Sequence, residues 1–388
     1  MKDFLKKVFV FALTASINVV ATQAQTYEEI SGRGVNIISS AVPFIDIAPD
    51  SRGGAMGNTG VASTPDMFSM HWNPAKFAFI GSDAGAAISY TPWLRKLVND
   101  INMYYLTGYK RIDDMQVIAA SVRYFTLGEI HYRSGPEDGG YQVKPNEYAI
   151  DVAYSRLLSQ KFSGSVAFRY IRSDMNFKED DSMKPGNSFA ADLAFYFRTP
   201  TNLIGSDSDL SAGINISNIG SKISYDGVNK EFIPTNMRLG IALDTEIDPY
   251  NKLNVNVDIN KLLVPTPGFS PSDANAEDYR QKYNDISVTK AMFQSFSDAP
   301  GGFEEELQEI NVSVGLEYWY VDQFAIRAGY FHEHENKGNR KLFTAGIGLK
   351  FNMMTLDASY IIPVVQDSPL ANTIRFSLGF DLGQFSKN

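Results

Sequence analysis

Few residues of this chain could do acid–base or metal chemistry, because it has four histidines and no cysteine. His332 and His334 flank Glu333, and residues two apart in a strand point to the same side, so a metal pair is conceivable there. No third ligand stands at a useful spacing. A lipid hydrolase, one class of function considered, would also need a nucleophile with a positioned base, usually histidine. We therefore expect no enzyme, no catalytic residue, no metal site and no cofactor.

A glycine-rich run at residues 52–60 is the other pattern with chemical potential. Phosphate-binding loops combine such glycines with a preceding strand and a following Gly-Lys-Ser/Thr, and both are missing here. Clusters of this kind also indicate tight, irregular backbone, and the surrounding segment is longer than a loop that only connects two elements. We interpret residues 25–83 as a compact plug, or hatch, in the mouth of a larger fold.

The N-terminus has the pattern of a secretory signal peptide. Lys2, Lys6 and Lys7 precede an apolar run at residues 8–20, and small residues follow up to a plausible cleavage site at Ala24. We therefore predict export, with residues 1–24 removed. Because the chain lacks cysteine, it has no site for a lipid-modified cysteine, so membrane attachment must come from the fold itself.

From residue 84 onward the chain alternates apolar and polar residues in segments of about ten residues, the length of a tilted membrane-spanning strand. In the clearest segment, Ile150 and Val152 alternate with Asp151 and Ala153. We predict an all-β protein, a transmembrane antiparallel barrel of about fourteen strands that occupies residues 84–388 in the outer membrane of a Gram-negative bacterium. The strands are expected at residues 84–93, 101–110, 116–127, 146–158, 161–172, 188–198, 208–219, 235–245, 251–262, 308–319, 322–332, 341–351, 353–362 and 372–382.

A soluble β-sandwich alternates too, but three features favour the membrane barrel. The connections alternate between short turns and longer loops, as they do between the periplasmic and external ends of such barrels. The polar face carries charges of both signs, which we expect to pair and to fill the interior. Aromatic residues stand at strand ends on the apolar face, where they would form membrane girdles; these are Tyr90, Tyr105, Tyr148, Tyr170, Tyr318, Tyr330 and Tyr360.

The connection from Leu263 to Gln308 is far longer than a barrel needs, and such loops are usually functional. It carries an acidic run at Glu304–Glu306 and six aromatic residues that are candidates for binding a protein partner, namely Phe269, Tyr279, Tyr283, Phe293, Phe296 and Phe303. The alternative is that this loop folds over its own barrel mouth and buries those rings. A net charge of −9 makes nucleic acid an unsuitable partner.

Several motifs together resemble one family. They are residues 44–52, the glycine-rich run continuing to Ala62, residues 71–76 and residues 89–95. This combination resembles the PorV family, barrel proteins of the type IX secretion system of Bacteroidetes, which is itself similar to the FadL group of fourteen-stranded transporters. The residues that carry the resemblance in the expected hatch are Pro49, Asp50, Arg52, Gly57, Asn73, Pro74 and Ala75.

The resemblance implies a role in secretion without catalysis. PorV-like proteins accompany the translocon barrel, bind the C-terminal signal domain of secreted cargo, and work with a surface attachment complex that contains a sortase-like peptidase. The expected partners are therefore these proteins and outer-membrane lipid. The FadL similarity leaves open the alternative of a transporter for hydrophobic small molecules, which would need an apolar conduit.

Overall fold

The structure, a computed structural model, describes residues 36–132, 140–175, 183–203, 206–267, 283, 285–366 and 368–383. The predicted signal peptide, Phe269 and Tyr279 lie outside these residues. Among the residues described, no helix is both long enough and apolar enough to cross a membrane.

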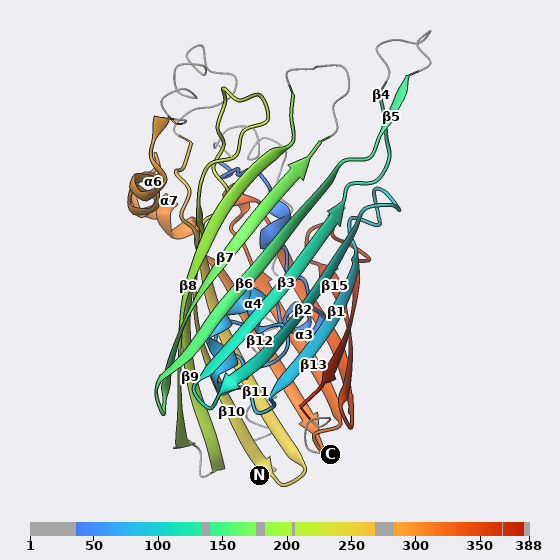
Figure 1. Ribbon diagram of the computed structural model, residues 1–388, viewed down its shortest axis with the longest axis vertical. Coiled ribbons are helices and arrows are strands. Elements are labelled where there is room, and N and C mark those ends of the chain that lie inside the picture. Colours follow the sequence, from blue (N-terminus) through green and yellow to red (C-terminus); the bar gives the residue numbers. More distant parts are fainter. Residues whose placement is uncertain are drawn as a thin grey trace. The chain divides into compact units, whose positions relative to one another are not determined.

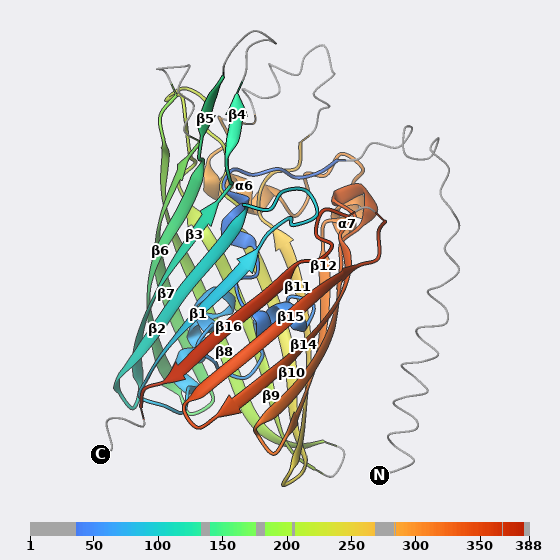
Figure 2. The same ribbon diagram turned by 90° about the vertical axis from the view of Figure 1, so that its right-hand side faces the viewer.

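Fourteen antiparallel strands form a closed barrel in which each strand pairs with its neighbours in sequence and β1 closes the ring against β16 (Figures 1 and 2). The barrel strands are β1 (Ala84–Pro92), β2 (Asn102–Asp113), β3 (Gln116–Thr126), β6 (Asn146–Ser159), β7 (Phe162–Asp174), β8 (Gly186–Leu203), β9 (Ser206–Gly220), β10 (Asn236–Asp248), β11 (Asn251–Leu262), β12 (Asn311–Tyr320), β13 (Phe324–His332), β14 (Lys341–Phe351), β15 (Met354–Pro363) and β16 (Ile374–Asp381). All fourteen predicted strands are confirmed within a few residues.

The two faces of the strands follow the predicted alternation. In β6, Asp151 and Ala153 are buried toward the lumen, whereas Ile150 and Val152 are 44% and 55% exposed on the outer surface. Tyr105 was wrongly assigned to the outer face, since it is 1% exposed inside the barrel, and its neighbour Tyr104 points outward instead. The alternating pattern could not show which of the two adjacent tyrosines faces outward.

The connections differ in length at the two ends of the barrel, as predicted. Turns at residues 114–115, 160–161, 249–250, 321–323 and 352–353 lie at one end, which we call the short-turn rim. Longer connections lie at the other end, the long-loop rim, and one of them carries an additional hairpin of β4 (Ile130–Tyr132) and β5 (Tyr141–Val143). This hairpin was not predicted, and Figure 1 shows it standing beyond the barrel strands.

Residues 37–83, which we call the luminal segment, pack inside the barrel. The segment forms short helices only, η1 (Pro43–Asp46), α3 (Ser51–Ala55), α4 (Ser69–Trp72) and η2 (Pro74–Phe79), and Figures 1 and 2 show α3 and α4 within the ring of strands. Its apolar side chains fill the space between small luminal residues, as Phe77 and Met70 do against Ala153 and Ala167. Large side chains from the segment thus complement small ones from the wall.

Candidate functional site

The motif residues that carry the family resemblance fix the luminal segment to the barrel wall. Asp50 caps α3 by accepting a hydrogen bond from the Gly53 backbone N–H at 2.7 Å, and its second oxygen accepts from Trp72 Nε1 at 2.7 Å. Arg52 donates to both carboxylate oxygens of Glu317, on β12, at 2.9 and 2.7 Å. These buried polar groups are one another's hydrogen-bond partners, so we assign them a structural role.

The glycine-rich run permits a close approach to the wall rather than phosphate binding. Gly57 has a φ of +69°, and a Cβ there would lie 2.7 Å from the backbone of Tyr330. A Cβ on Gly329 would lie 2.0 Å from the Gly57 nitrogen. The two backbones can meet only because both positions lack a side chain.

The Asn73-Pro74-Ala75 element joins the luminal segment to three neighbouring strands. The Asn73 side-chain amide donates to the carbonyl of Phe195 on β8 at 3.0 Å, and its oxygen accepts from the Ala75 N–H at 3.0 Å. The hydroxyls of Ser155 and Ser163 donate to the carbonyls of Pro74 and Ala75, each at 2.7 Å. Pro49 is also buried in this segment.

Several luminal charges pair with one another, as expected from the charges of both signs on the polar face. Arg169 lies 2.5 Å from Asp151 and 3.0 Å from Asp192. Arg327 is 2.6 Å from both Glu317 and Asp357, so an ion-pair chain runs from Arg52 of the luminal segment across the wall. These paired charges are neutralised inside the protein, and their side chains do not form the apolar conduit that a hydrophobic transporter needs.

The histidines have ordinary structural roles. Burial and the neighbouring Arg123 lower the pKa of His71 well below its usual value, so the ring is neutral and its Nδ1 accepts a hydrogen bond from Arg123 at 2.9 Å. His334 Nδ1 accepts from the Asn336 N–H at 3.2 Å and so begins η3 (Glu335–Lys337). Within the described ranges, no group of three or more His, Asp or Glu side chains could hold a metal ion.

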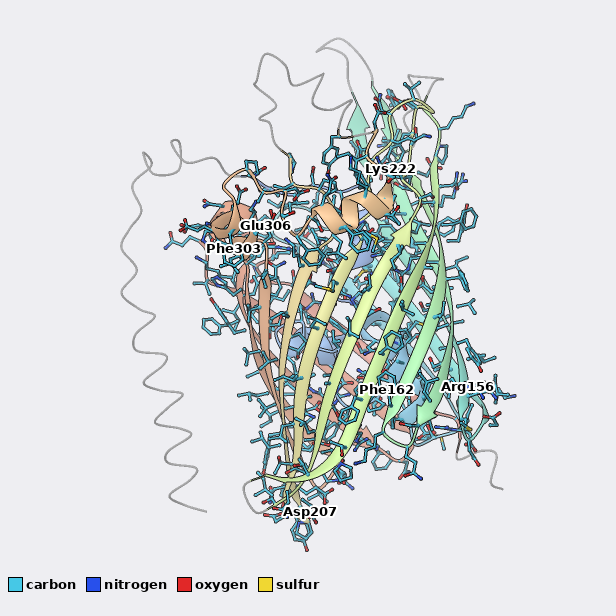
Figure 3. All side chains as sticks on the ribbon, turned by 90° about the vertical axis from the view of Figure 1, so that its left-hand side faces the viewer. Arg156, Phe162, Asp207, Lys222, Phe303 and Glu306 are labelled. Carbon is cyan, nitrogen blue, oxygen red and sulfur yellow. The ribbon has the colours of Figure 1, made fainter. Side chains whose placement is uncertain are left out.

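The long connection between β11 and β12 places two short helices, α6 (Val288–Gln294) and α7 (Phe303–Gln308), at the long-loop rim. Figure 3 shows Phe303 on α7 at this rim and Asp207 at the opposite end of the barrel. Phe293 and Phe303 are 78% and 76% exposed, and Phe296 is 48% exposed. We call these three rings the rim aromatics.

Tyr283, the fourth described candidate, faces the protein rather than solvent. Its ring packs edge-on against Phe232 with a centroid distance of 5.4 Å, next to Val264 and Ala291. These contacts help to hold the loop over the barrel mouth, and we do not include Tyr283 among the rim aromatics. Of the four candidate rings that the structure describes, the loop packs one against the protein and leaves three exposed.

The acidic run at the start of α7 anchors the helix. Lys261, at the end of β11, lies 3.0 Å from Glu306 and 2.6 Å from Glu309, and Lys337 lies 2.5 Å from Glu305 and 3.0 Å from Glu309. We call these five residues the α7 clamp. Since both lysines are nearly buried, the clamp holds a helix that has few apolar contacts of its own in a fixed place. Sequence reasoning missed this role because the pairs join distant segments.

The comparisons with known proteins agree with this architecture. Residues 31–269 match the family model described as Type IX secretion system protein PorV. The crystal structure of the P. putida toluene transporter TodX is similar with a TM-score of 0.53 and 9% identity, over 86% of this chain and 97% of that chain. A Pseudomonas aeruginosa FadL homologue gives a TM-score of 0.45 and 12% identity, over 90% of this chain and 100% of that chain. No curated protein matches. At such identities the likeness to solved structures concerns the fold alone, a closed antiparallel β-barrel.

Proposed function

Because the chain belongs to the PorV family and is an outer-membrane component of the type IX secretion system, we propose that its long-loop rim binds secreted cargo. The bound part is the C-terminal signal domain of the cargo, which the barrel receives from the translocon barrel and passes to the surface attachment complex with its sortase-like peptidase. The luminal segment serves as a hatch that keeps the barrel closed during this transfer.

The rim aromatics carry this proposal. Exposed aromatic side chains are enriched where proteins bind one another, and a few such anchors typically dominate the binding energy. Phe303 stands on a helix that the α7 clamp holds in place, so little ordering remains to be done on binding. The three exposed phenylalanines stand on a loop outside the barrel wall, so we assign them to partner binding rather than to the stability of the barrel.

The test replaces the rim aromatics Phe293, Phe296 and Phe303 by serine together and measures binding of a purified cargo C-terminal domain. Truncated anchors typically cost about 2 kcal/mol or more each, so we expect binding to fall at least tenfold and cargo to stay off the cell surface. The matched control replaces Tyr250 and Phe351, which are 62% and 73% exposed at the short-turn rim. Equal secretion by both variants would contradict the proposal.

The orientation of the barrel is part of the proposal, since cargo must meet the long-loop rim on the outer side. An epitope tag inserted after Asn229, in a long connection, should be accessible to antibody on intact cells. A tag after Asp114, in a short turn, should become accessible after the outer membrane is permeabilised. The reverse labelling pattern would place the rim aromatics in the periplasm.

The second candidate function is transport of hydrophobic small molecules, which the fold shared with a toluene transporter suggests. That function requires a path past the luminal segment, where ion pairs and packed side chains now lie. A deletion strain that secretes cargo normally but loses uptake of an apolar substrate would favour transport. Loss of secretion with unchanged uptake would favour the cargo receptor.

A further inference from the structure

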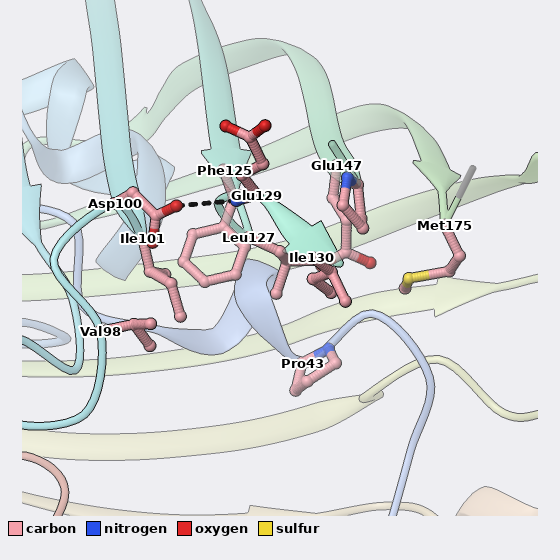
Figure 4. A pocket seen from close by; sticks show the side chains of 11 residues that line it. Pro43, Val98, Asp100, Ile101, Phe125, Leu127, Glu129, Ile130, Glu147 and Met175 are labelled. Atoms are coloured by element: carbon pink, nitrogen blue, oxygen red, sulfur yellow. Dashed lines mark hydrogen bonds between the residues drawn. The ribbon is translucent and has the colours of Figure 1, made fainter. Parts of the chain in front are cut away.

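An apolar pocket of about 510 Å³ opens at the long-loop rim, away from α6 and α7, over the ends of β2, β3 and β6 (Figure 4). Its volume lies in the range of about 300–1,000 Å³ that is usual for ligand pockets. Six apolar side chains form most of its wall, namely Val98, Ile101, Phe125, Leu127, Ile130 and Met175.

The floor of this rim pocket is closed by the luminal segment. Pro43 lines the pocket from below, and the next residue, Phe44, is 1% exposed and stacks on Phe125 with a centroid distance of 6.1 Å. Ile45 and Met103 pack in the same cluster. The pocket therefore ends on a packed core rather than continuing into the lumen, which suits a receptor site better than the entrance of a conduit.

Three carboxylates line the otherwise apolar pocket. Glu147 is 2% exposed, and within the described ranges its one hydrogen-bond partner is the Ser173 hydroxyl at 2.7 Å. Asp100 accepts a hydrogen bond from the Glu129 N–H at 2.7 Å, and Glu129 lies 3.6 Å from the exposed Lys144. In Figure 4, Asp100 and Glu147 lie on opposite sides of the pocket, with Phe125 and Leu127 between them.

A buried carboxylate with one neutral hydrogen-bond donor is costly unless a cation pairs with it. Other buried carboxylates of the wall are better compensated, since Asp151 and Asp192 have Arg169, and Asp258 accepts hydrogen bonds from two backbone N–H groups. Glu147 has neither an ion pair nor a second hydrogen-bond donor among the described residues, and it lines an apolar pocket through which a visiting cation could reach it. Lysine and arginine fit this geometry, since their long stems pack on apolar surface while the charged end reaches an acceptor.

We propose that the rim pocket binds a lysine or arginine side chain of the cargo C-terminal domain, with an adjacent apolar residue on the pocket wall. This inference rests on the proposed function and specifies which partner side chain is recognised. The cation pairs with Glu147, and Asp100 and Glu129 at the opening attract it on approach. The rim aromatics and the rim pocket then form two separate contact areas on one face of the barrel.

The experiment measures binding of a purified cargo C-terminal domain to the detergent-solubilised full-length barrel. Glu147→Gln retains an acceptor for Ser173 but removes the charge, and we expect affinity to fall roughly ten- to hundred-fold with a weaker dependence on ionic strength. Val98→Trp keeps the charge but fills the pocket, and should weaken binding to a similar extent. Glu246→Gln is the matched control, because the Glu246 side chain is 58% exposed near the short-turn rim, away from both contact areas.

The outcomes separate the two proposals. Normal binding by Glu147→Gln and Val98→Trp, with loss in the serine variant of the rim aromatics, overturns the pocket and leaves the cargo receptor standing. Normal binding by all three variants overturns both. A third probe is benzyltrimethylammonium, a small apolar cation. If Glu147→Gln abolishes binding of this probe and leaves cargo binding unchanged, the pocket is a small-molecule site and the proposal is wrong.

Discussion

The α7 clamp gives a sharp test of what holds the rim helix, by replacing Lys261 with methionine. The Lys261 Nζ lies 3.0 Å from Glu306 and 2.6 Å from Glu309, and the three side chains are at most 8% exposed. Removing one partner of such a buried pair costs about 3–5 kcal/mol, because the remaining charge stays desolvated. Since α7 lies outside the strand ladder, we expect the helix to leave the rim and return its carboxylates to water, while the barrel stays folded.

Amide hydrogen exchange measures this undocking directly. A loss of about 3–5 kcal/mol corresponds to exchange that is faster by roughly 140- to 4,000-fold for residues 303–309, with β11 and β12 unchanged. The matched control is Lys252→Met on the same strand, because Lys252 lies 3.1 Å from both Glu246 and Asp322 but these side chains are 30–59% exposed. Exposed pairs contribute about 0–1 kcal/mol. Unchanged exchange in Lys261→Met, or equal effects in both variants, would refute the reasoning.

Three further predictions concern the lipid face, the luminal contact and the loop. Val152→Arg places a charge in lipid and should destabilise the barrel by about 2–4 kcal/mol. Ala153→Arg should fold no better, because Ala153 packs against the luminal segment. A normal yield of folded barrel for either variant in heat-modifiability gels would show that the assigned facing or packing is wrong. Gly329→Ala should lower the thermal unfolding temperature, because its Cβ would overlap the Gly57 backbone, and an unchanged temperature would disprove that contact. Burial raises the pKa of Asp298 to about 6 from 3.8, so the docked loop takes up a proton as the pH falls through 6 and becomes more stable. Amide hydrogen exchange in the loop, corrected for intrinsic rates, should therefore slow from pH 7 to pH 5 in the native chain but not in Asp298→Asn.

The barrel could be predicted from the sequence because each strand has one face in lipid and one in the lumen, and this forces a period of two on every segment. The pattern failed at Tyr105, where adjacent tyrosines suit either face. It also missed β4 and β5, since that hairpin extends past the barrel and has neither environment to impose the alternation.

The composition of the candidate binding surface could be predicted from the sequence, but its geometry could not. Aromatic residues on a long loop indicated binding, and three of the described ones are exposed, but the burial of Tyr283 depends on Phe232 some fifty residues earlier in the chain. In the same way, the sequence gives no sign that Glu305 and Glu306 form ion pairs, because their partners Lys337 and Lys261 lie far from them in the chain. Contacts between distant segments decide both cases, and local patterns do not contain them.

The contacts of the luminal segment have a consequence for the order in which this protein assembles. Ser51 bonds to Ser377, 326 residues later, Arg52 to Glu317, 265 residues later, and Gly57 to Thr344, 287 residues later. The part of the chain that is synthesised first therefore finds its partners on the strands that are synthesised last. Residues 51–57 can therefore complete their contacts with the wall only when β12 to β16 are in place, whereas Asn73, Pro74 and Ala75 have partners on β6, β7 and β8. The contacts of residues 51–57 thus belong to the same late stage of folding as the pairing of the final strand with the first.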